Sequence, residues 1–261
     1  MQAKGDVWAD VADQFVAHYR SVRGRVRTYV IDRHLAMHLP PPPATVVDIG
    51  GGAGHQSLPL ARRGYQVCLV DPSTSMLSHA MSSVEEEPDD VRSRFRLVEA
   101  TGQDAPSTLA SERFDAVLCH GVLPYIEDPA PFVAGMCGLV VPDGLVSIVA
   151  KNRDALPIGP ALRGDWGAAI TALGASHEVN RLGLPTRADT VSGIGKILED
   201  ADVEIIDWYG VRFFSDLVTN QEPDGADELL RLELELSQRD PYRLLSRLFH
   251  IVGRRRVGAG A

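Results

Sequence analysis

The sequence has no segment suited to crossing a membrane or directing export. No apolar run reaches eighteen residues, and the N-terminal stretch MQAKGDVWADVADQF lacks the apolar core of a signal peptide. The three cysteines, Cys68, Cys119 and Cys137, are an odd number without metal-ligand spacing, so no metal site is expected. These absences predict a soluble cytoplasmic protein with reduced cysteines and no membrane contact.

Positive charge is also scarce. The chain carries 26 Lys and Arg against 35 Asp and Glu, a formal net charge of -9. Such a chain is not drawn to nucleic acid by its overall field, so an RNA partner would need a local basic patch. Its 261 residues, 44% of them apolar, are enough for a sizeable core.

Strand and helix patterns alternate through residues 44–152. The runs VVDI, VCLV and AVLC are almost continuously apolar, as is typical of parallel strands buried on both faces. Alternating strands and helices predict an α/β fold with a parallel sheet covered by helices on both faces.

The flanking segments complete this organisation. Apolar residues at helical spacing end at PPPP, so residues 1–43 are expected to form a helical lead-in that can close over the site as a lid. Residues 153–188 are rich in Gly, Pro and Ala, which indicates an insertion of short helices and loop after the fifth strand. Residues 189–254 return to the sheet. We therefore predict one domain, 1–261, with seven strands, the last antiparallel.

The stretch VVDIGGGAGHQSLPLARRGYQVCLVD, residues 46–71, carries the clearest signal of function. Gly50, Gly52 and Gly54 allow a tight turn and close approach of a ligand, and the N–H groups of the next helix face the same place. Asp71, at the end of the second strand, can accept hydrogen bonds from two ribose hydroxyls. This half-site fits either a dinucleotide or S-adenosylmethionine, whereas a tight turn without a ligand is the plainer alternative.

The glycine spacing separates the two ligands. A dinucleotide fingerprint, G-x-G-x-x-G, counted from Gly50 requires glycine where His55 stands, which disfavours a nicotinamide dehydrogenase. The pattern present, Asp48-x-Gly50-x-Gly52-x-Gly54, resembles the first motif of class I S-adenosylmethionine-dependent methyltransferases, over residues 44–150. That resemblance implies a Rossmann-like sheet, a cofactor-binding core at 44–152, and an acid, Asp48, that engages the amino-acid part of the cofactor.

Two further stretches match the same family. EATGQDA follows the third strand, and the resemblance implies that Gly102, Gln103 and Asp104 lie beside the adenine. FDAVLCHGVLPYIEDP resembles the family's fourth motif, which would place His120 next to the methyl donor.

The ends of the chain show a closer resemblance. DQFVAHYRSVRGRVRTYVI, GVRFFSDL and LELELSQRDPYRLLSRLFHI together resemble the tRNA 5-carboxymethoxyuridine methyltransferase family, which methylates the carboxylate of a modified wobble uridine. The resemblance implies that Arg27 pairs with the cofactor's carboxylate, that Gly51 and Gly52 pass under it, and that Asp71 holds the ribose. The positions it suggests for acceptor binding are Arg212, Arg239, Tyr242 and Arg247.

The sequence departs from that family where tRNA would be tracked. A lysine run of the family is replaced by GASHEVNRLGLPTR, and the family's Leu-Glu-Trp is Leu123-Pro124-Tyr125. These departures and the acidity disfavour tRNA and favour a small-molecule acceptor. A carboxylate acceptor needs no base and would be oriented by Arg212 and Arg247, whereas a hydroxyl would use His120 as a base.

The sequence thus predicts S-adenosylmethionine-dependent methylation, at an oxygen of a small molecule, with S-adenosylhomocysteine as product. Two alternatives stay open: a carboxyl methyltransferase acting on the wobble nucleoside of tRNA, and a non-catalytic module that binds S-adenosylmethionine. The identity of the acceptor and the oligomeric state are not indicated.

Overall fold

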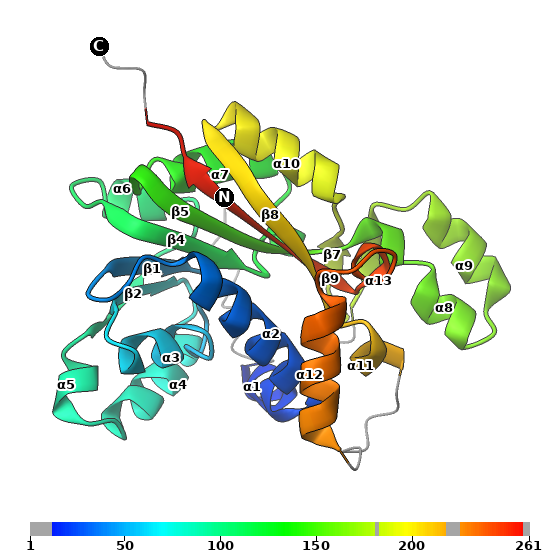
Figure 1. The fold of residues 1–261 in the computed structure, drawn as a ribbon, viewed down its shortest axis with the longest axis horizontal. Helices are drawn as coiled ribbons and strands as arrows, with labels where there is room; N and C mark the ends of the chain where they lie inside the picture. Colours follow the sequence, from blue (N-terminus) through cyan, green and yellow to red (C-terminus); the bar gives the residue numbers. More distant parts are fainter. Residues whose placement is uncertain (1–11, 181–182, 218–224, 258–261) are drawn as a thin grey trace.

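A seven-stranded sheet forms the centre of the molecule (Figure 1). The computed structural model describes residues 12–180, 183–217 and 225–257. The strand order is β3-β2-β1-β4-β5-β9-β8. The strands are β1 (Thr45–Ile49), β2 (Gln66–Asp71), β3 (Phe95–Glu99), β4 (Phe114–His120), β5 (Val140–Lys151), β8 (Val203–Val211) and β9 (Leu248–Arg255).

The pairing confirms the predicted sheet. Strands β1 to β5 pair in parallel, whereas β9 lies between β5 and β8 and is antiparallel to both. The strands β1, β2, β4, β5 and β8 therefore all end at the same edge of the sheet, here called the carboxyl edge. This is the edge at which open α/β sheets bind ligands.

Helices cover both faces of the sheet. Those before the insertion are α1 (Ala12–Arg20), α2 (Val22–His38), α3 (Ser57–Arg62), α4 (Thr74–Glu85), α5 (Asp89–Arg92), α6 (Ala105–Thr108) and α7 (Pro129–Cys137), with a 3-10 turn, η1 (Leu123–Tyr125). Those from the insertion onward are η2 (Arg153–Ala155), α8 (Ile158–Leu162), α9 (Trp166–Leu173), α10 (Val191–Asp200), α11 (Phe214–Leu217), α12 (Ala226–Leu236) and α13 (Tyr242–Leu245).

Alternate residues of the central strands pack into two large cores, one on each face of the sheet. On one face, sheet residues such as Val117 and Ile148 pack with Phe132 of α7 and Leu198 of α10. On the other face, residues such as Leu118 and Val149 pack with α2 and α3. The strands read as continuously apolar because both of their faces are buried.

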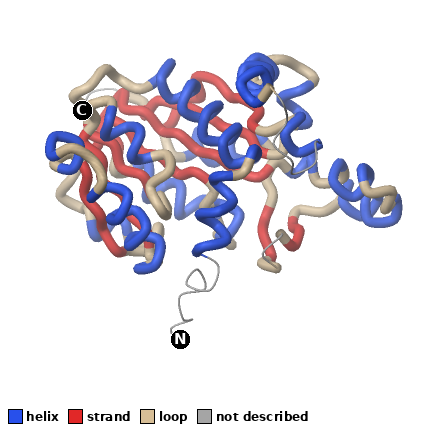
Figure 2. Tube along the Cα trace, turned by 90° about the horizontal axis from the view of Figure 1, so that it is seen from below, coloured by secondary structure: helices blue, strands red, loops and turns tan. Residues whose placement is uncertain are grey.

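The N-terminal helices are as predicted, whereas the insertion differs from the prediction in one feature. The lead-in is two helices, because Ser21 caps α2 by accepting a hydrogen bond from the amide of Gly24, and residues 1–11 lie outside the described part. The insertion contains a hairpin, β6 (His177–Val179) with β7 (Pro185–Arg187), in addition to short helices and loop. Three-residue strands are too short to give a period in the sequence. Figure 2 shows the hairpin and α8–α9 extending from the layered body.

Burial of the cysteines follows the prediction. Cys68 in β2, Cys119 in β4 and Cys137 in α7 are free thiols inside the protein. Burial raises the pKa of Cys68 to about 11 and that of Cys137 to about 12, so both thiols stay protonated at neutral pH. Among the described residues, no helix has the length and apolar character needed to span a bilayer.

Candidate active site

The loop after β1 is shaped by its glycines. Gly50, Gly52 and Gly54 have φ of +71°, +54° and +78°, a region that other residues enter only with strain. A Cβ on Gly50 would lie 2.2 Å from Cγ2 of Val122, so a side chain cannot be accommodated there. A Cβ on Gly51 would lie 2.9 Å from Oδ2 of Asp48. The loop therefore keeps a bare backbone surface at the carboxyl edge.

Asp48 is a buried carboxylate beneath this loop. Its Oδ2 accepts a hydrogen bond from Oγ of Ser57 at 2.5 Å, while its Oδ1 is buried without a hydrogen-bond partner in the part of the chain that the structure describes. Burial raises the pKa of Asp48 to about 6, against the lowering effects of the Ser57 hydrogen bond and of Arg27. An unpaired buried oxygen suits a ligand that brings a donor or a positive charge.

Asp71 ends β2 next to the loop. Its Oδ2 accepts from the amide of Gly52 at 2.8 Å, and its Oδ1 accepts from the amide of Ser73 at 3.0 Å. These two backbone groups fix the orientation of the carboxylate at the carboxyl edge, the place expected for a group that binds ribose.

Arg27 and His120 meet on the opposite side of the loop. Arg27, in α2, is only 7% exposed, so it is not a surface arginine, and its Nη2 donates to the backbone oxygen of His120 at 3.0 Å. Burial, and secondarily Arg27, holds the pKa of His120 well below its ordinary value. Nε2 of His120 contacts Oγ of Ser147 at 2.8 Å, and Nδ1 has no partner within the described segments.

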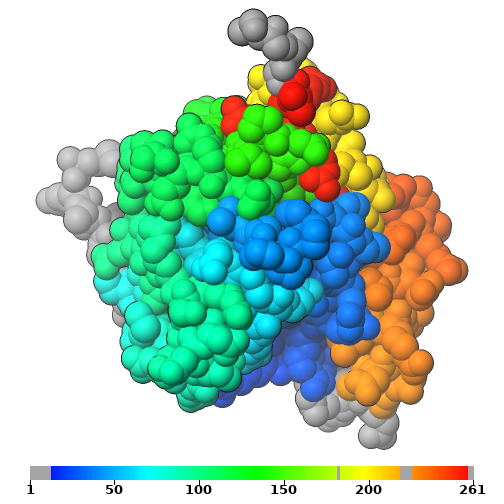
Figure 3. All heavy atoms as spheres, turned by 60° about the vertical axis from the view of Figure 1, so that its left-hand side comes forward, coloured from blue at the N-terminus to red at the C-terminus, as the bar shows by residue number. Residues whose placement is uncertain are grey.

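Helix α1 is tied to the glycine loop by an aromatic contact. The ring of Tyr19 stacks on that of His55, with centroids 4.1 Å apart and 10° between planes, and the Arg27 guanidinium lies 5.2 Å from the Tyr19 centroid. Figure 3 shows the N-terminal helices between the region of residues 50–80 and α12. This position is the one that a lid would need, and movement of α1 stays a prediction.

The segment after β3 is partly structural. A Cβ on Gly102 would lie 2.6 Å from Cε2 of Phe132, so packing of α7 requires glycine there. Gln103 and Asp104 are exposed, and Oδ2 of Asp104 accepts from the Thr101 hydroxyl at 2.7 Å. Contact of Gly102, Gln103 and Asp104 with an adenine stays a prediction.

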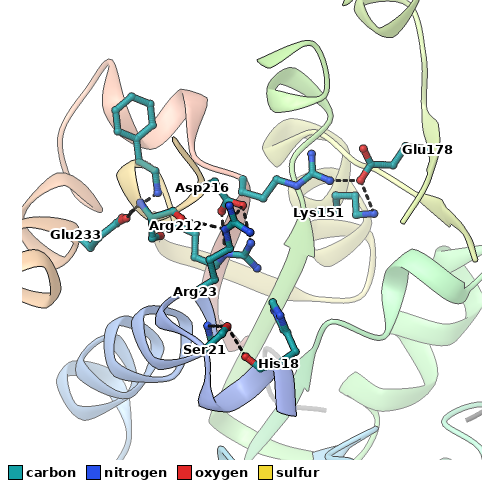
Figure 4. A network of polar contacts seen from close by, with 12 residues as sticks. His18, Ser21, Arg23, Lys151, Glu178, Arg212, Asp216 and Glu233 are labelled. Atoms are coloured by element: carbon teal, nitrogen blue, oxygen red, sulfur yellow. Dashed lines mark hydrogen bonds and ion pairs between the residues drawn. The ribbon is translucent and has the colours of Figure 1, made fainter. Parts of the chain in front are cut away.

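A second group of charges lies at the carboxyl edge beside β5, β8 and β9 (Figure 4). Arg212 follows β8 with φ +68°, and its Nε and Nη2 donate to the two oxygens of Asp216 in α11 at 2.9 and 2.7 Å. Arg23 of α2 donates to the backbone oxygen of Ser215 at 3.0 Å and lies 3.5 Å from Asp216.

The other half of this group joins the insertion to the sheet. Nζ of Lys151, the last residue of β5, lies 2.8 Å from Oε1 of Glu178 in β6, and Arg247, just before β9, also bonds to Glu178. Burial lowers the pKa of Lys151, the Glu178 contacts oppose this, and Arg247 and Arg212 lower it further. We call Arg23, Lys151, Arg212 and Arg247 the cationic cluster.

The cationic cluster contains more positive charges than the carboxylates that pair with it. Asp216 and Glu178 pair with its four cations, and a third carboxylate, Glu233, accepts from the backbone amides of Phe213 and Ser215. Arg23 and Lys151 are each 8% exposed, so these two charges sit largely out of water, whereas the side chains of Arg247 and Glu178 are each 25% exposed. Such a cluster can exchange a protein carboxylate for one brought by a ligand.

Sequence reasoning found only part of this group. Arg212 and Arg247 are in it, whereas Arg239 is a surface residue paired with Glu235, and Tyr242 packs edge-on against Phe213. Arg23, Lys151, Glu178 and Asp216 were missed. Lys151 could have been found by the signal that marked Asp71 and His120: a polar residue closing an apolar strand.

Residues 47–148 match the family model of the methyltransferase domain. The chain is also 28% identical, over 94% of its length and 95% of the relative's, to the tRNA 5-carboxymethoxyuridine methyltransferase of Escherichia coli (strain K12). It is an S-adenosylmethionine-dependent methyltransferase.

One further relative and two solved structures are similar to this chain. The ubiquinone biosynthesis O-methyltransferase of Stutzerimonas stutzeri (strain A1501) is 33% identical over 49% of this methyltransferase and 52% of the relative. The CcbJ methyltransferase of Streptomyces caelestis shares its fold, with a TM-score of 0.62, 15% identity, and coverage of 97% of this chain and 98% of that one. The glycopeptide N-methyltransferase MtfA, solved with S-adenosyl-L-methionine, gives a TM-score of 0.56 at 12% identity, covering 86% and 92%.

Proposed function

We propose that this methyltransferase methylates a carboxylate oxygen of a small molecule held by the cationic cluster. The proposal has two parts, a donor side at the glycine loop and an acceptor side at the cluster. Both lie at the carboxyl edge of the sheet, so one ligand can face the other.

The residues of the donor side fit S-adenosylmethionine. Oδ1 of Asp48, buried and unpaired among the described residues, suits the ammonium group, and buried Arg27 suits the carboxylate of its amino-acid part. Asp71 suits the ribose, and the segment from Gly102 to Asp104 the adenine. When bound, the cofactor would supply a methyl group on a positively charged sulfur: the acceptor oxygen would bond to the methyl carbon in line as the carbon–sulfur bond breaks, with S-adenosylhomocysteine as the leaving group.

The cationic cluster is the observation that carries the proposal for the acceptor. Arginine forks bind carboxylates by two parallel hydrogen bonds and orient them. A carboxylate is ionised and nucleophilic near neutral pH, so no proton has to be removed during transfer. The work of the protein is then to hold the oxygen in line and exclude water, which the low exposure of the cluster favours.

Cofactor binding and methyl transfer can be measured separately, so the donor side and the acceptor side are tested independently. Binding of S-adenosylmethionine and S-adenosylhomocysteine is measured by calorimetry, and methyl transfer is measured with a panel of carboxylic acids and matched alcohols. Arg247→Met is expected to reduce transfer to carboxylates at least tenfold while leaving cofactor affinity within twofold. Arg239→Met is the matched control, because Arg239 is exposed and paired outside the cluster.

The outcomes are distinct. Failure of both cofactors to bind at micromolar concentration would overturn the donor side. Methylation of alcohols in preference to acids would overturn the carboxylate assignment and make His120 the candidate base. Cofactor binding without transfer to any acceptor would indicate the non-catalytic module.

A second candidate acceptor is a carboxylate-bearing nucleoside in tRNA. It is favoured by the similarity to the Escherichia coli tRNA 5-carboxymethoxyuridine methyltransferase, which extends over nearly the whole of both chains. Nucleoside profiles of tRNA from cells with and without the gene test it. An unchanged level of the methyl ester of 5-carboxymethoxyuridine would exclude the tRNA role.

A further inference from the structure

Five buried side chains form a continuous series of hydrogen bonds leading away from the end of β4. Nε2 of His120 contacts Oγ of Ser147 at 2.8 Å, and the same oxygen contacts Nε2 of His250 at 2.7 Å. Nδ1 of His250 contacts Nδ1 of His34 at 3.2 Å, and Nε2 of His34 contacts Oγ of Ser237 at 2.9 Å. None of the five is more than 8% exposed. We call this series the histidine chain.

Ser237, at the far end of the histidine chain, fixes the direction in which hydrogen bonds are donated along the chain. Oγ of Ser237 donates its proton to the backbone oxygen of Leu234 at 2.6 Å, so it can only accept from His34. His34 therefore carries its proton on Nε2. A neutral imidazole has one N–H, so Nδ1 of His34 is an acceptor and Nδ1 of His250 must donate to it.

The proton positions of His250 and Ser147 fix that of His120. With its proton on Nδ1, neutral His250 accepts at Nε2, and the hydroxyl of Ser147 must donate to it. The oxygen of Ser147 is then left to accept from Nε2 of His120. Nδ1 of His120 is thus a lone pair, and it is buried without a partner in the described ranges.

The three histidines of the histidine chain remain neutral. Burial lowers the pKa of His34 to about 3, with a smaller contribution from His38. Burial also keeps the pKa values of His250 and His120 well below the ordinary value, and Arg27 lowers both further. The ring of Tyr209 stacks on that of His34, with the ring centroids 3.9 Å apart, and the Tyr209 hydroxyl contacts His38.

We propose that Ser237, His34, His250 and Ser147 are positioning residues that hold His120 in the tautomer with the proton on Nε2 and a lone pair on Nδ1. The proposal rests on the proposed function only in placing His120 beside the methyl donor. There a lone pair can accept a weak C–H contact from a methyl group on positive sulfur. An N–H at Nδ1 would instead donate to the acceptor oxygen and weaken it as a nucleophile.

Reversing the tautomer would reverse the whole histidine chain. Each group would exchange its donor and acceptor roles, and the hydroxyl of Ser237 would have to leave the Leu234 oxygen for His34. The loss of that one hydrogen bond favours the observed direction roughly tenfold, which corresponds to about 1.4 kcal/mol.

The tautomer of His120 can be measured in the free protein, without the cofactor or a methyl acceptor. In protein labelled with 15N-histidine, two-bond 1H–15N correlations distinguish protonated from unprotonated ring nitrogens, and loss of the His120 signals in His120→Gln assigns that ring. We expect an unprotonated Nδ1 at His120. A proton on Nδ1 of His120 in the unaltered protein would overturn the proposal.

Two variants test whether the other residues of the histidine chain determine the tautomer of His120. Ser237→Ala removes the group that fixes the direction, and Ser147→Ala removes the acceptor for His120, so each is expected to give a mixture of His120 tautomers. If one of the two does not fold, the other carries the test. Ser246→Ala is the control, since Ser246 is equally buried and its hydroxyl donates to the Tyr242 oxygen, outside the histidine chain. An unchanged His120 spectrum in a folded Ser147→Ala or Ser237→Ala protein would overturn the positioning role.

A titration distinguishes failure of this inference from failure of the proposed function. S-adenosylmethionine is expected to shift the Nδ1 resonance of His120 more than S-adenosylhomocysteine, which lacks the methyl group and the charge. If neither binds, the proposed function fails while the tautomer measurement on the free protein stands. Binding with equal shifts from both would overturn the contact between Nδ1 and the methyl donor.

Discussion

The proposed donor and acceptor sides of the site use charge in opposite ways. The donor side is made mainly of backbone, and its buried acid Asp48 keeps one oxygen unpaired within the described residues. The cationic cluster is made of long side chains, and its arginines and lysine are already paired with protein carboxylates. On the proposed function, this difference means that the donor side is preformed for a positive group of the cofactor, whereas the acceptor side would release Glu178 or Asp216 when an anion binds.

The largest effect is expected from a substitution that distorts the backbone of the glycine loop on the proposed donor side. Gly50→Ala forces a non-glycine residue to φ +71° and places its Cβ against Val122, so the loop must move. We expect cofactor affinity to fall by about a hundredfold or more, measured by calorimetry, together with a lower melting temperature. Such a loss would show that the donor side depends on the shape of its backbone.

Gly164→Ala is the matched control for this change. Gly164 has a similar φ of +75°, but a Cβ there has no heavy atom within 4 Å, so only backbone strain of about 1 kcal/mol is added. Cofactor affinity should be unchanged in this variant. If Gly50→Ala also binds the cofactor within threefold of the unaltered protein, the glycine loop is not the cofactor site.

The next largest effect is expected from replacing Asp48, the buried acid with one unpaired oxygen among the described residues. Asp48→Asn should weaken cofactor binding about tenfold and yet stabilise the free protein at pH 7, by up to about 3 kcal/mol, because the cost of burying a charge disappears. The pKa of Asp48 is raised by folding, from 3.8 to about 6, so its contribution to stability is present below pH 3.8 and is lost as pH rises through 6.

Denaturant titrations between pH 4 and 7 measure this contribution. The free energy of unfolding of the unaltered protein should decrease relative to that of Asp48→Asn as pH rises across this window. Asp115→Asn provides the control, because Asp115 is a partly buried acid of β4 that already accepts from Thr45. A variant Asp48→Asn that is less stable than the unaltered protein at pH 7 would contradict the burial argument.

The two sides also differ in how far the sequence predicts them. On the proposed donor side, Asp48, the glycine turn and Asp71 lie between residues 48 and 71, so local spacing was enough to predict a cofactor site there, whereas Arg27 was added by the family resemblance alone. The cationic cluster depends on α2, β5, β6, β8, β9 and α11, which only the fold brings together. Spacing alone could not show that Glu178 of the insertion pairs with Lys151, nor that Ser147 and His250 meet inside an apolar core.

Glu178→Gln sharpens the comparison on the acceptor side. Removing this carboxylate leaves Lys151 and Arg247 without their shared partner, so a carboxylate ligand no longer has to displace it. We expect the KM for a carboxylate acceptor to fall about threefold, and the protein to lose about 1 kcal/mol of stability. Glu235→Gln, which removes the exposed partner of Arg239, should change neither quantity. A higher KM in Glu178→Gln would mean that Glu178 helps to bind the acceptor.

The smallest effect is expected from the titration of Lys151. Burial lowers its pKa, so it loses its charge at a lower pH than an exposed lysine does, and the groups that face it are Glu178, Arg247 and Arg212. Because the neutral amine no longer attracts an anion, the KM for a carboxylate acceptor should rise as pH increases in the alkaline range below 10.5, while cofactor affinity stays constant. Lys151→Arg keeps its charge at every accessible pH and should flatten the profile. A profile that is equally steep in both proteins would place the titrating group outside the cationic cluster.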